Sequence, residues 1–384
     1  MMNSPEIKSK LPNLPVSIFT SMTQLARKHG AINLGQGFPD FSMDEKLQEL
    51  VFKAMKDGHN QYAHSNGNPF LREVLSAKIQ SLYGFQPDPE TEITITPGGT
   101  YAISNALTAV LRDGDEVILF EPCFDSYIPN IRIMGAVPVT ISLRHPDYSI
   151  PWEEVRRKIT SRTRMILINS PQNPSGSVFS EADIQQLRSI VEGTDIIIMS
   201  DEVYEHLVFD GEKHESILRY PDLFARSFVA FSLGKVLHCT GWKIGYCVAP
   251  QAFTKEFRNH HQFNVFSVSS ALQQGIAEYL QEPQTYLGLP AFFQRKRDLF
   301  LEGIKGSIFQ PLQTKGSYFQ CVQFPEEVAK SSADFAETLT ETPGVAAIPL
   351  SAFYADGTDN RVLRFCFAKE DETLLMATER LKKI

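Results

Sequence analysis

Short apolar runs alternate with stretches of helical spacing along most of the chain. Six of these runs are EITITP (92–97), DEVILF (115–120), RMILIN (164–169), DIIIMS (195–200), SFVAFS (227–232) and IGYCVAP (244–250). Segments with helical spacing follow them, for example DEVYEHLVF (201–209) and QAFTKEFRNHHQF (251–263). Strands that are apolar along their whole length are typical of a sheet covered by helices on both faces. The pattern therefore predicts a mostly parallel α/β unit over about residues 35–280.

The end of the chain follows a different order. QRKRDLFLEGI and SSADFAETLTE have helical spacing, GSYFQCVQF, VAAIPL and RVLRFCFA are typical of strands, and EDETLLMATERLKKI predicts a closing helix. Pro and Gly accumulate at QEPQTYLGLP (281–290), which indicates a boundary. We therefore expect a large domain over residues 35–283 and a smaller α+β domain over residues 284–384, with residues 1–34 as its N-terminal arm.

Composition narrows the possible partners. The 384 residues are 42% hydrophobic and 21% charged, with a formal net charge of −8 and no basic arm, so we expect no nucleic-acid partner. The start, MMNSPEIKSKLPNLP, lacks the apolar core of a signal peptide, and the apolar runs are too short to span a bilayer, so we expect no membrane association. Five cysteines without a C-x-x-C pair or metal-ligand spacing predict reduced thiols, no metal and a cytoplasmic location.

Glycines and polar residues follow the predicted strands, where ligands bind in open parallel sheets. They are Gly98, Gly99 and Thr100 after the first strand, Asn173 after the third, Asp201 and Tyr204 after the fourth, and Ser232, Lys235 and Lys243 after the fifth. Taken singly, each has a structural explanation, such as a glycine turn, a turn before proline or a lysine at the surface. Taken together, they predict one crevice with an anion cradle, an amide, a carboxylate and an amine.

Pyridoxal phosphate is a ligand that needs all of these groups. Its aldehyde needs a lysine amine, its pyridine nitrogen needs a carboxylate, and its phosphate needs glycines, hydroxyls and a cation. Desolvation and the charge of Lys243 would lower the pKa of Lys235 and leave its amine nucleophilic. Ser232 and Lys235 also match the S-x-x-K element of serine acyl-enzymes, but S-D-N is missing and KGS (315–317) is a poor match to K-T-G.

Several blocks resemble the class I/II aminotransferases of the fold-type I pyridoxal-phosphate superfamily. They are NSPQNPSGSVF, SDEVYEHLVF and SLGKVLHCTGWKIGYCVAP, strengthened by INLGQGFPDF, NQYAHSNGNPFLRE and RFCFAK. The resemblance extends from about Ile32 to the C-terminus and is strongest to the branch of methionine aminotransferases and kynurenine–oxoglutarate (glutamine) transaminases. It implies an α/β fold with a mostly parallel seven-stranded sheet between helices, plus a smaller α+β domain.

The resemblance implies a role for each cofactor-binding residue. Lys235 would form the Schiff base with pyridoxal phosphate and then move the proton between the substrate and the cofactor. Asp201 would pair with the pyridine nitrogen, while Asn173 and Tyr204 would bind the ring 3-oxygen. Phe124 would stack on the ring. Gly99, Thr100, Ser232 and Lys243 would hold the phosphate, with Lys243 standing where many class I enzymes have arginine. Tyr62 would reach the phosphate of the neighbouring subunit, which implies a homodimer.

The resemblance also implies the substrate side of the site. Arg364 would grip the α-carboxylate, next to the backbone of Gly37 and the amide of Asn173. The expected side-chain pocket consists of Ile18, Phe19, Tyr62, Phe124, Phe353 and Tyr354. No second basic residue is evident for the distal group of a dicarboxylate. The expected amino donors are therefore methionine and the aromatic amino acids, with kynurenine or glutamine as further candidates. Glu202, next to Asp201, is expected to have a structural role.

Three functions are compatible with these residues. The first is transfer of an amino group to a 2-oxo acid by a ping-pong mechanism. The second is a C–S β-lyase acting on cysteine conjugates or cystathionine with the same cofactor. The third is a ligand-sensing domain of a transcription regulator, which the absence of a basic N-terminal DNA-binding domain disfavours. We expect the transaminase.

Overall fold

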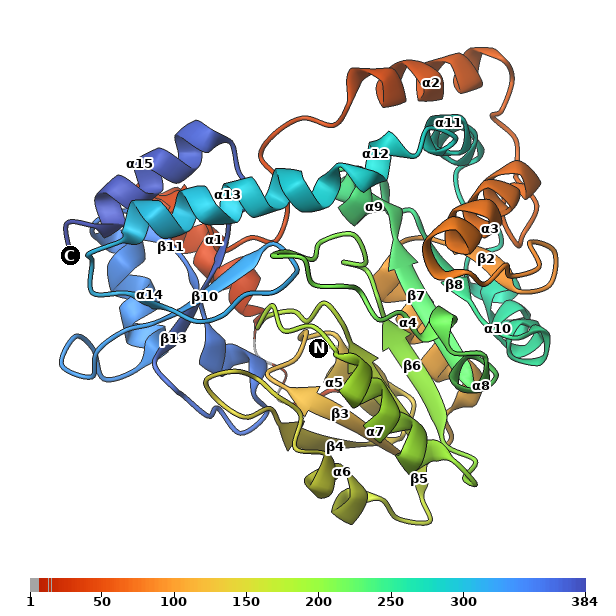
Figure 1. Cartoon of the computed structure of the whole chain (residues 1–384), viewed down its shortest axis with the longest axis horizontal. Coiled ribbons are helices and arrows are strands. Elements are labelled where there is room, and N and C mark those ends of the chain that lie inside the picture. Colours follow the sequence, from red (N-terminus) through yellow and green to blue (C-terminus); the bar gives the residue numbers. More distant parts are fainter. Residues whose placement is uncertain (1–6, 13, 15) are drawn as a thin grey trace, which may run out of the picture.

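The computed structural model describes residues 7–12, 14 and 16–384, so residues 1–6, 13 and 15 of the predicted N-terminal arm lie outside it. Its centre is a seven-stranded sheet in the order β2-β8-β7-β6-β5-β3-β4 (Figure 1). The strands are β2 (Ile93–Thr96), β3 (Glu116–Glu121), β4 (Val137–Ser142), β5 (Thr163–Asn169), β6 (Ile197–Asp201), β7 (Ser227–Ser232) and β8 (Gly245–Val248). All run in one direction except β8, which is antiparallel to both neighbours. The predicted α/β fold with a mostly parallel sheet is confirmed.

Helices cover both faces of this sheet. The helices of this part are α2 (Glu45–Lys56), α3 (Pro69–Tyr83), α4 (Gly99–Val110), α5 (Tyr127–Ile133), α6 (Trp152–Lys158), α7 (Glu181–Val191), α8 (Pro221–Phe224), α9 (Leu233–Val236), α10 (Gln251–Asn264) and α11 (Ser270–Leu280). Helix α2 packs on α11 and does not cover the sheet. In Figure 1, α7 lies in front of the sheet and α4 behind it. Successive residues of β3 serve the two faces: Val117 and Leu119 join the core under α4 and α5, whereas Ile118 and Phe120 join the core under α7.

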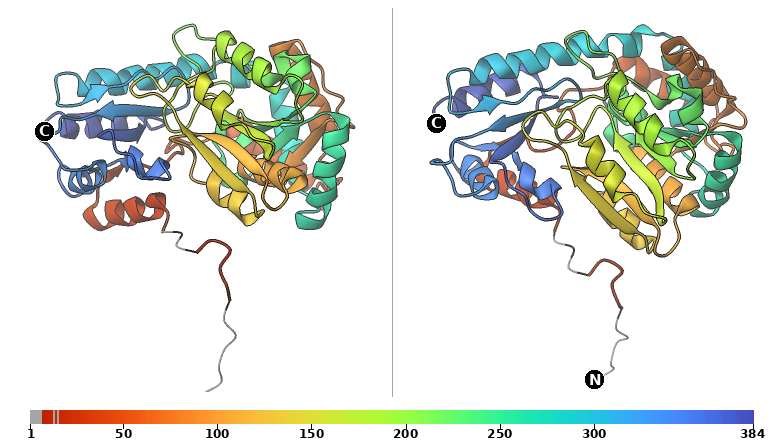
Figure 2. Two further views of the ribbon diagram at one scale, coloured as in Figure 1. Left: turned by 90° about the horizontal axis from the view of Figure 1, so that it is seen from below. Right: turned by 60° about the horizontal axis from the view of Figure 1, so that its bottom comes forward.

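A second, antiparallel sheet has the order β12-β13-β10-β9. Its strands are β9 (Gln310–Pro311), β10 (Phe319–Gln323), β12 (Ile348–Pro349) and β13 (Val362–Cys366), and the helices of this part are α12 (Gln284–Leu287), α13 (Leu289–Ile304), α14 (Ser332–Glu341) and α15 (Asp371–Leu381). From the start of the chain, α1 (Ile18–His29) packs beside α14, and β1 (Ile32–Asn33) pairs with β11 (Val345–Ala346). Figure 2 shows this red segment beside the blue C-terminal elements. The division at residues 35–283 stays a prediction.

Two details differ from the sequence-based prediction. Strand β4 went unrecognised because it is an edge strand with Pro138 and partly exposed positions, so it lacks a continuous apolar run. Residues 203–206, expected to begin a helix, form a turn instead, and Glu202 and Glu205 on either end of it are buried against other elements. The apolar residues of DEVYEHLVF are thus spaced like those of a helix, but they are apolar because the turn that they form is buried.

No helix among the described residues combines the length and the apolar character needed to cross a membrane. The longest, α13, carries several charged residues in its sequence LPAFFQRKRDLFLEGI.

Candidate active site

A cavity of about 310 Å³ lies where β6 and β7 end and α4 begins. Most of the predicted site residues line it: Phe19, Gly37, Gly99, Thr100, Phe124, Asn173, Asp201, Tyr204, Ser232, Lys235, Lys243 and Arg364. Residues far apart in sequence meet here because the carboxyl ends of the parallel strands share one edge of the sheet. The cavity therefore brings together the groups that the strand-end pattern predicted.

Four of the predicted residues do not line this cavity: Ile18, Tyr62, Phe353 and Tyr354. Ile18 is partly buried at the start of α1, and Tyr354 is buried next to Phe353. Phe353 is buried beside the cavity, with its ring centroid 5.9 Å from that of Phe19 and 5.0 Å from the guanidinium carbon of Arg364. Tyr62 is 82% exposed and packs edge-on against Phe266 at the surface, with ring centroids 5.1 Å apart. Tyr62 therefore does not contribute to the cavity of its own chain.

The amine of Lys235 is held by two oxygen atoms. Lys235 follows β7 in the short helix α9, and its Nζ lies 2.9 Å from the carbonyl oxygen of Gly37 and 2.5 Å from the hydroxyl of Tyr318. Desolvation lowers the pKa of Lys235 to about 8, and the positive charges of Arg364 and Lys243 act in the same direction. A substantial fraction of the amine is therefore neutral, and hence nucleophilic, in mildly alkaline solution.

Asp201 presents a buried carboxylate at the end of β6. It is 4% exposed; its Oδ2 accepts a hydrogen bond from the hydroxyl of Tyr127 at 2.5 Å, and its Oδ1 accepts one from the backbone N–H of Val203 at 3.2 Å. Burial raises the pKa of Asp201 to about 6, and the hydrogen bond from Tyr127 opposes that rise. A cationic N–H donor in the cavity would stabilise the ionised form.

Asp201→Asn is expected to stabilise the cofactor-free protein above pH 6. The pKa of Asp201 is about 6 in the folded protein against an ordinary 3.8, so the folded state disfavours the carboxylate. Its contribution opposes folding above about pH 6 and vanishes below about pH 4. The variant should gain up to about 3 kcal/mol in free energy of unfolding at pH 8 and almost nothing at pH 4. Urea unfolding at both pH values measures this, and an equal gain at both would contradict it.

Another part of the cavity wall, at the start of α4, suits a phosphate. Helix α4 begins at Gly99, after Gly98 in a conformation with φ of 85°. A Cβ on Gly98 would lie in ordinary contact with Lys243 Nζ, at 3.4 Å, so Gly98 lies beside the ammonium. A Cβ on Gly99 would clash with Val203 at 2.7 Å, so glycine lets the start of α4 approach the turn after β6. Free N–H groups at the start of a helix, the hydroxyl of Ser232 and the charge of Lys243 together favour a bound anion.

Arg364 is a buried cation in the wall of the cavity. It is 0% exposed in the middle of β13, and its two terminal nitrogens donate to Asn173 Oδ1 and to the carbonyl oxygen of Gly35, both at 2.8 Å. Its guanidinium carbon lies 3.9 Å from the ring centroid of Phe319, and Nε has no partner. Among the described residues no carboxylate forms an ion pair with it. A buried guanidinium that lacks a counterion is suited to bind a substrate carboxylate.

Sequence reasoning missed Tyr127 and Tyr318. Tyr127 lies three residues after Phe124 at the start of α5, and this spacing places the two rings together, 5.7 Å apart. Tyr318 immediately precedes β10, in an alternating aromatic segment that is equally typical of a core strand. Only the fold shows that its hydroxyl meets Lys235.

One cavity thus combines a nucleophilic amine, a buried carboxylate, an anion-binding helix start and, within the described part of the chain, a guanidinium without a counterion. Together these groups define a site for amine chemistry on amino acids. The family model "Aminotransferase class I and II" matches residues 29–381. The chain belongs to this family and is a transaminase, and membership implies pyridoxal phosphate as the cofactor.

Individual relatives match over nearly the whole length. A methionine aminotransferase from Escherichia coli is 43% identical, with 100% of both chains covered. A solved structure of an Escherichia coli methionine aminotransferase superimposes with a TM-score of 0.96 at 42% identity, covering 99% of this chain and 100% of that one. The N-succinyldiaminopimelate aminotransferase of Mycobacterium tuberculosis superimposes with a TM-score of 0.93 at 33% identity, with coverage of 98% and 100%. A human kynurenine–oxoglutarate transaminase is 31% identical, with 97% of both chains covered.

Proposed function

We propose that this protein transfers the α-amino group of neutral apolar or aromatic amino acids, methionine first among them, to a 2-oxo acid by a ping-pong mechanism. The observation that carries the proposal is that Lys235, Asp201 and Arg364 line one cavity. An amino acid held there by its carboxylate would present its α-carbon to the amine.

The residues present fit pyridoxal phosphate. The cofactor supplies an aldehyde that condenses with amines and a ring that takes up electrons. Lys235 would hold it covalently, and Asp201, a buried acceptor with a raised pKa, would pair with the ring nitrogen. Thr100, Ser232 and Lys243 would bind its phosphate.

The chain's own residues would then handle the substrate and its proton. Arg364 and Asn173, already joined by a hydrogen bond of 2.8 Å, would bind the α-carboxylate together. Lys235 would take the α-proton and return it, with the Tyr318 hydroxyl and the Gly37 carbonyl oxygen holding its Nζ. Aromatic side chains such as Phe19 and Phe124 would exclude water from the reacting atoms.

The cavity wall supports apolar side chains as substrates. Phe19, Phe38, Ile103, Phe124 and Phe319 line it. Its cationic side chains, Lys235, Lys243 and Arg364, already have roles, so none is left for the distal carboxylate of aspartate. The similarity to proteins named methionine aminotransferase and kynurenine–oxoglutarate transaminase points the same way.

A panel of the twenty amino acids with several 2-oxo acids tests this specificity. We expect kcat/KM for methionine, phenylalanine or tyrosine to exceed that for aspartate by at least about 100-fold, because a distal carboxylate would be desolvated without a partner. Aspartate as the best donor would contradict the pocket assignment. Release of ammonia without a 2-oxo acid would indicate β-lyase chemistry instead.

The homodimer is part of the same proposal. Phe52, Met55, Tyr62, Phe263 and Phe266 are exposed large apolar residues from α2, the segment after it and the end of α10. Aromatic side chains gathered at the surface are typical of an interface. A second copy covering them would let Tyr62 reach the partner's phosphate site. Sedimentation that shows a monomer at micromolar concentration would contradict this.

A cytoplasmic location also belongs to the proposal. The five cysteines are buried free thiols, as expected where disulfides do not form.

A further inference from the structure

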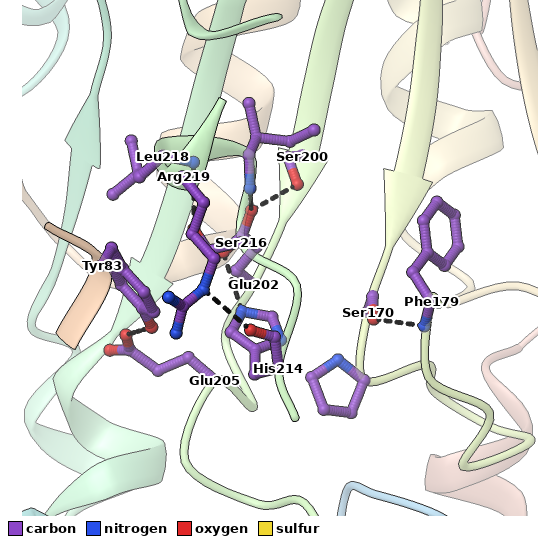
Figure 3. Close-up of polar contacts among 12 residues, drawn as sticks. Tyr83, Ser170, Phe179, Ser200, Glu202, Glu205, His214, Ser216, Leu218 and Arg219 are labelled. Carbon is purple, nitrogen blue, oxygen red and sulfur yellow. Dashed lines mark hydrogen bonds and ion pairs between the residues drawn. The ribbon is translucent and has the colours of Figure 1, made fainter. Parts of the chain in front are cut away.

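The turn after β6 has two sets of side chains with different surroundings. Asp201 and Tyr204 line the cavity, whereas Glu202 and Glu205 are buried in a polar network. The network extends to β8 through Tyr246 and to α3 and the segment 214–217, of which Figure 3 shows Tyr83, His214 and Ser216. Glu202 is 1% exposed and Glu205 is 4% exposed. Two carboxylates are rarely buried so close together in sequence without a reason, since each must be compensated by partners.

Glu205 is bound by three side chains. Its Oε1 lies 2.5 Å from Lys78 Nζ and accepts a hydrogen bond from the hydroxyl of Tyr246 at 3.3 Å, while its Oε2 accepts one from the hydroxyl of Tyr83. The side chains of Lys78 and Glu205 are only 1% and 2% exposed. Burial alone would raise the pKa of Glu205, but the nearby Lys78 and the hydrogen bond from Tyr83 hold that pKa at about 2. Glu205 is therefore a buried carboxylate at neutral pH.

Glu202 stabilises the beginning of the same turn through contacts with three other residues. Its Oε2 lies 2.9 Å from His214 Nε2, and its Oε1 accepts hydrogen bonds from the hydroxyl of Ser200 at 2.8 Å and from the backbone N–H of Ile217 at 3.0 Å. Figure 3 shows His214 and Ser216 beside Glu202, with Tyr83 and Glu205 at one side of the group. The turn is thus held at both ends.

One partner of Glu205, Tyr246, lies close in sequence to a phosphate-binding residue and packs against the neighbour of another. Tyr246 lies in β8, three residues after Lys243, and its ring stacks on that of Phe231 with centroids 4.7 Å apart. Phe231 immediately precedes Ser232. The Glu205 carboxylate therefore joins the turn of Asp201 and Tyr204 to β7, which ends at Ser232, and to β8, which begins two residues after Lys243.

We infer that Glu205 and Lys78 are positioning residues that fix Asp201 and Tyr204 relative to the phosphate-binding residues Ser232 and Lys243. This inference rests on the proposed cofactor site. The cofactor is a rigid ring with its phosphate at one edge, so both ends bind well only when their spacing is held. The alternative is that the ion pair contributes only to folding.

The double variant Lys78→Met/Glu205→Gln separates the two explanations. Removing one partner alone would leave a buried charge and destabilise the fold, whereas removing both charges avoids this. We expect the double variant to fold but to bind pyridoxal phosphate at least about tenfold more weakly, because misplacement of binding groups is costly. The visible absorbance of bound cofactor should also titrate at a shifted pH, since Asp201 would sit differently against the ring.

A control variant removes a different ion pair, which is more exposed than that of Lys78 and Glu205. Glu116 at the start of β3 and Arg162 just before β5 lie 2.5 Å apart at the end of the sheet away from the cavity, and the side chain of Arg162 is 69% exposed. Arg162→Met/Glu116→Gln should leave the cofactor dissociation constant within about twofold of the wild type, because its site contacts are intact. Urea unfolding of both cofactor-free double variants shows how much stability each has lost.

The outcomes are distinct. Two results would overturn the inference. The first is a folded Lys78→Met/Glu205→Gln variant with wild-type cofactor affinity and an unshifted absorbance titration. The second is an equal loss of cofactor affinity in the control variant at an equal loss of stability. If that double variant fails to fold, Tyr246→Phe decides, since it removes one contact to Glu205 and no charge. Weaker cofactor binding in Tyr246→Phe supports the inference, and unchanged binding overturns it. Failure of the wild type to bind pyridoxal phosphate would instead refute the proposed function.

Discussion

Lys235→Ala should abolish amino transfer, with a loss in kcat/KM of at least about 10⁴-fold. Two contributions disappear together: the covalent attachment of the cofactor and the base that moves the α-proton. The visible absorbance of the covalently bound cofactor should disappear as well. The fold should be preserved, because only the hydrogen bonds to Gly37 and Tyr318 are lost.

Lys235→Arg is the matched control for charge. It keeps a cation near Gly37 and Tyr318, but a guanidinium stays protonated and is neither a nucleophile nor a base. Both variants should therefore be equally inactive, while circular dichroism and urea unfolding report a folded protein. Substantial activity in Lys235→Arg, or a wild type that stays colourless with added pyridoxal phosphate, would refute the assignment of Lys235.

Much of the site could be predicted because, in a parallel sheet, the residues that bind ligands directly follow the carboxyl ends of the strands. The run DIIIMS predicts a buried strand, and the residue that follows it, Asp201, must then lie at the edge where ligands bind. The same reasoning placed Lys235 and Ser232 after β7. Family resemblance supplied Arg364, which lies within a strand of the second sheet and has no strand-end signal of its own.

The missed features depend on contacts between distant parts of the chain. Lys78 and Glu205 are 127 residues apart in sequence, and nothing local to either residue predicts their ion pair. Tyr318 meets Lys235 across 83 residues. Glu202 was expected to be structural, and its bonds to His214 and Ile217 agree with that. The link from Glu205 to Tyr246 in β8 appears only in the fold.

Arg364→Lys should raise KM for methionine by about 100-fold and lower kcat/KM by about 10²–10³-fold. A lysine carries the charge but cannot form the planar fork, so at least one charge-assisted hydrogen bond to the α-carboxylate is lost and Asn173 loses its donor. Phe319 and Phe353, which flank the guanidinium, would pack against a thinner side chain. Cofactor affinity should be unchanged, because the phosphate and ring-nitrogen contacts lie on other residues.

The control for this variant is Arg361→Lys, three residues earlier in the same segment. Arg361 lies 3.7 Å from Glu326 in an ion pair away from the cavity lining, so its effect on KM should stay within about twofold. A methionine analogue that lacks the α-carboxylate gives a second test, since it has no group for Arg364 to bind. It should inhibit the wild type and Arg364→Lys equally, whereas methionine should distinguish them. Equal loss of affinity for both compounds would show that Arg364 shapes the pocket without binding the carboxylate.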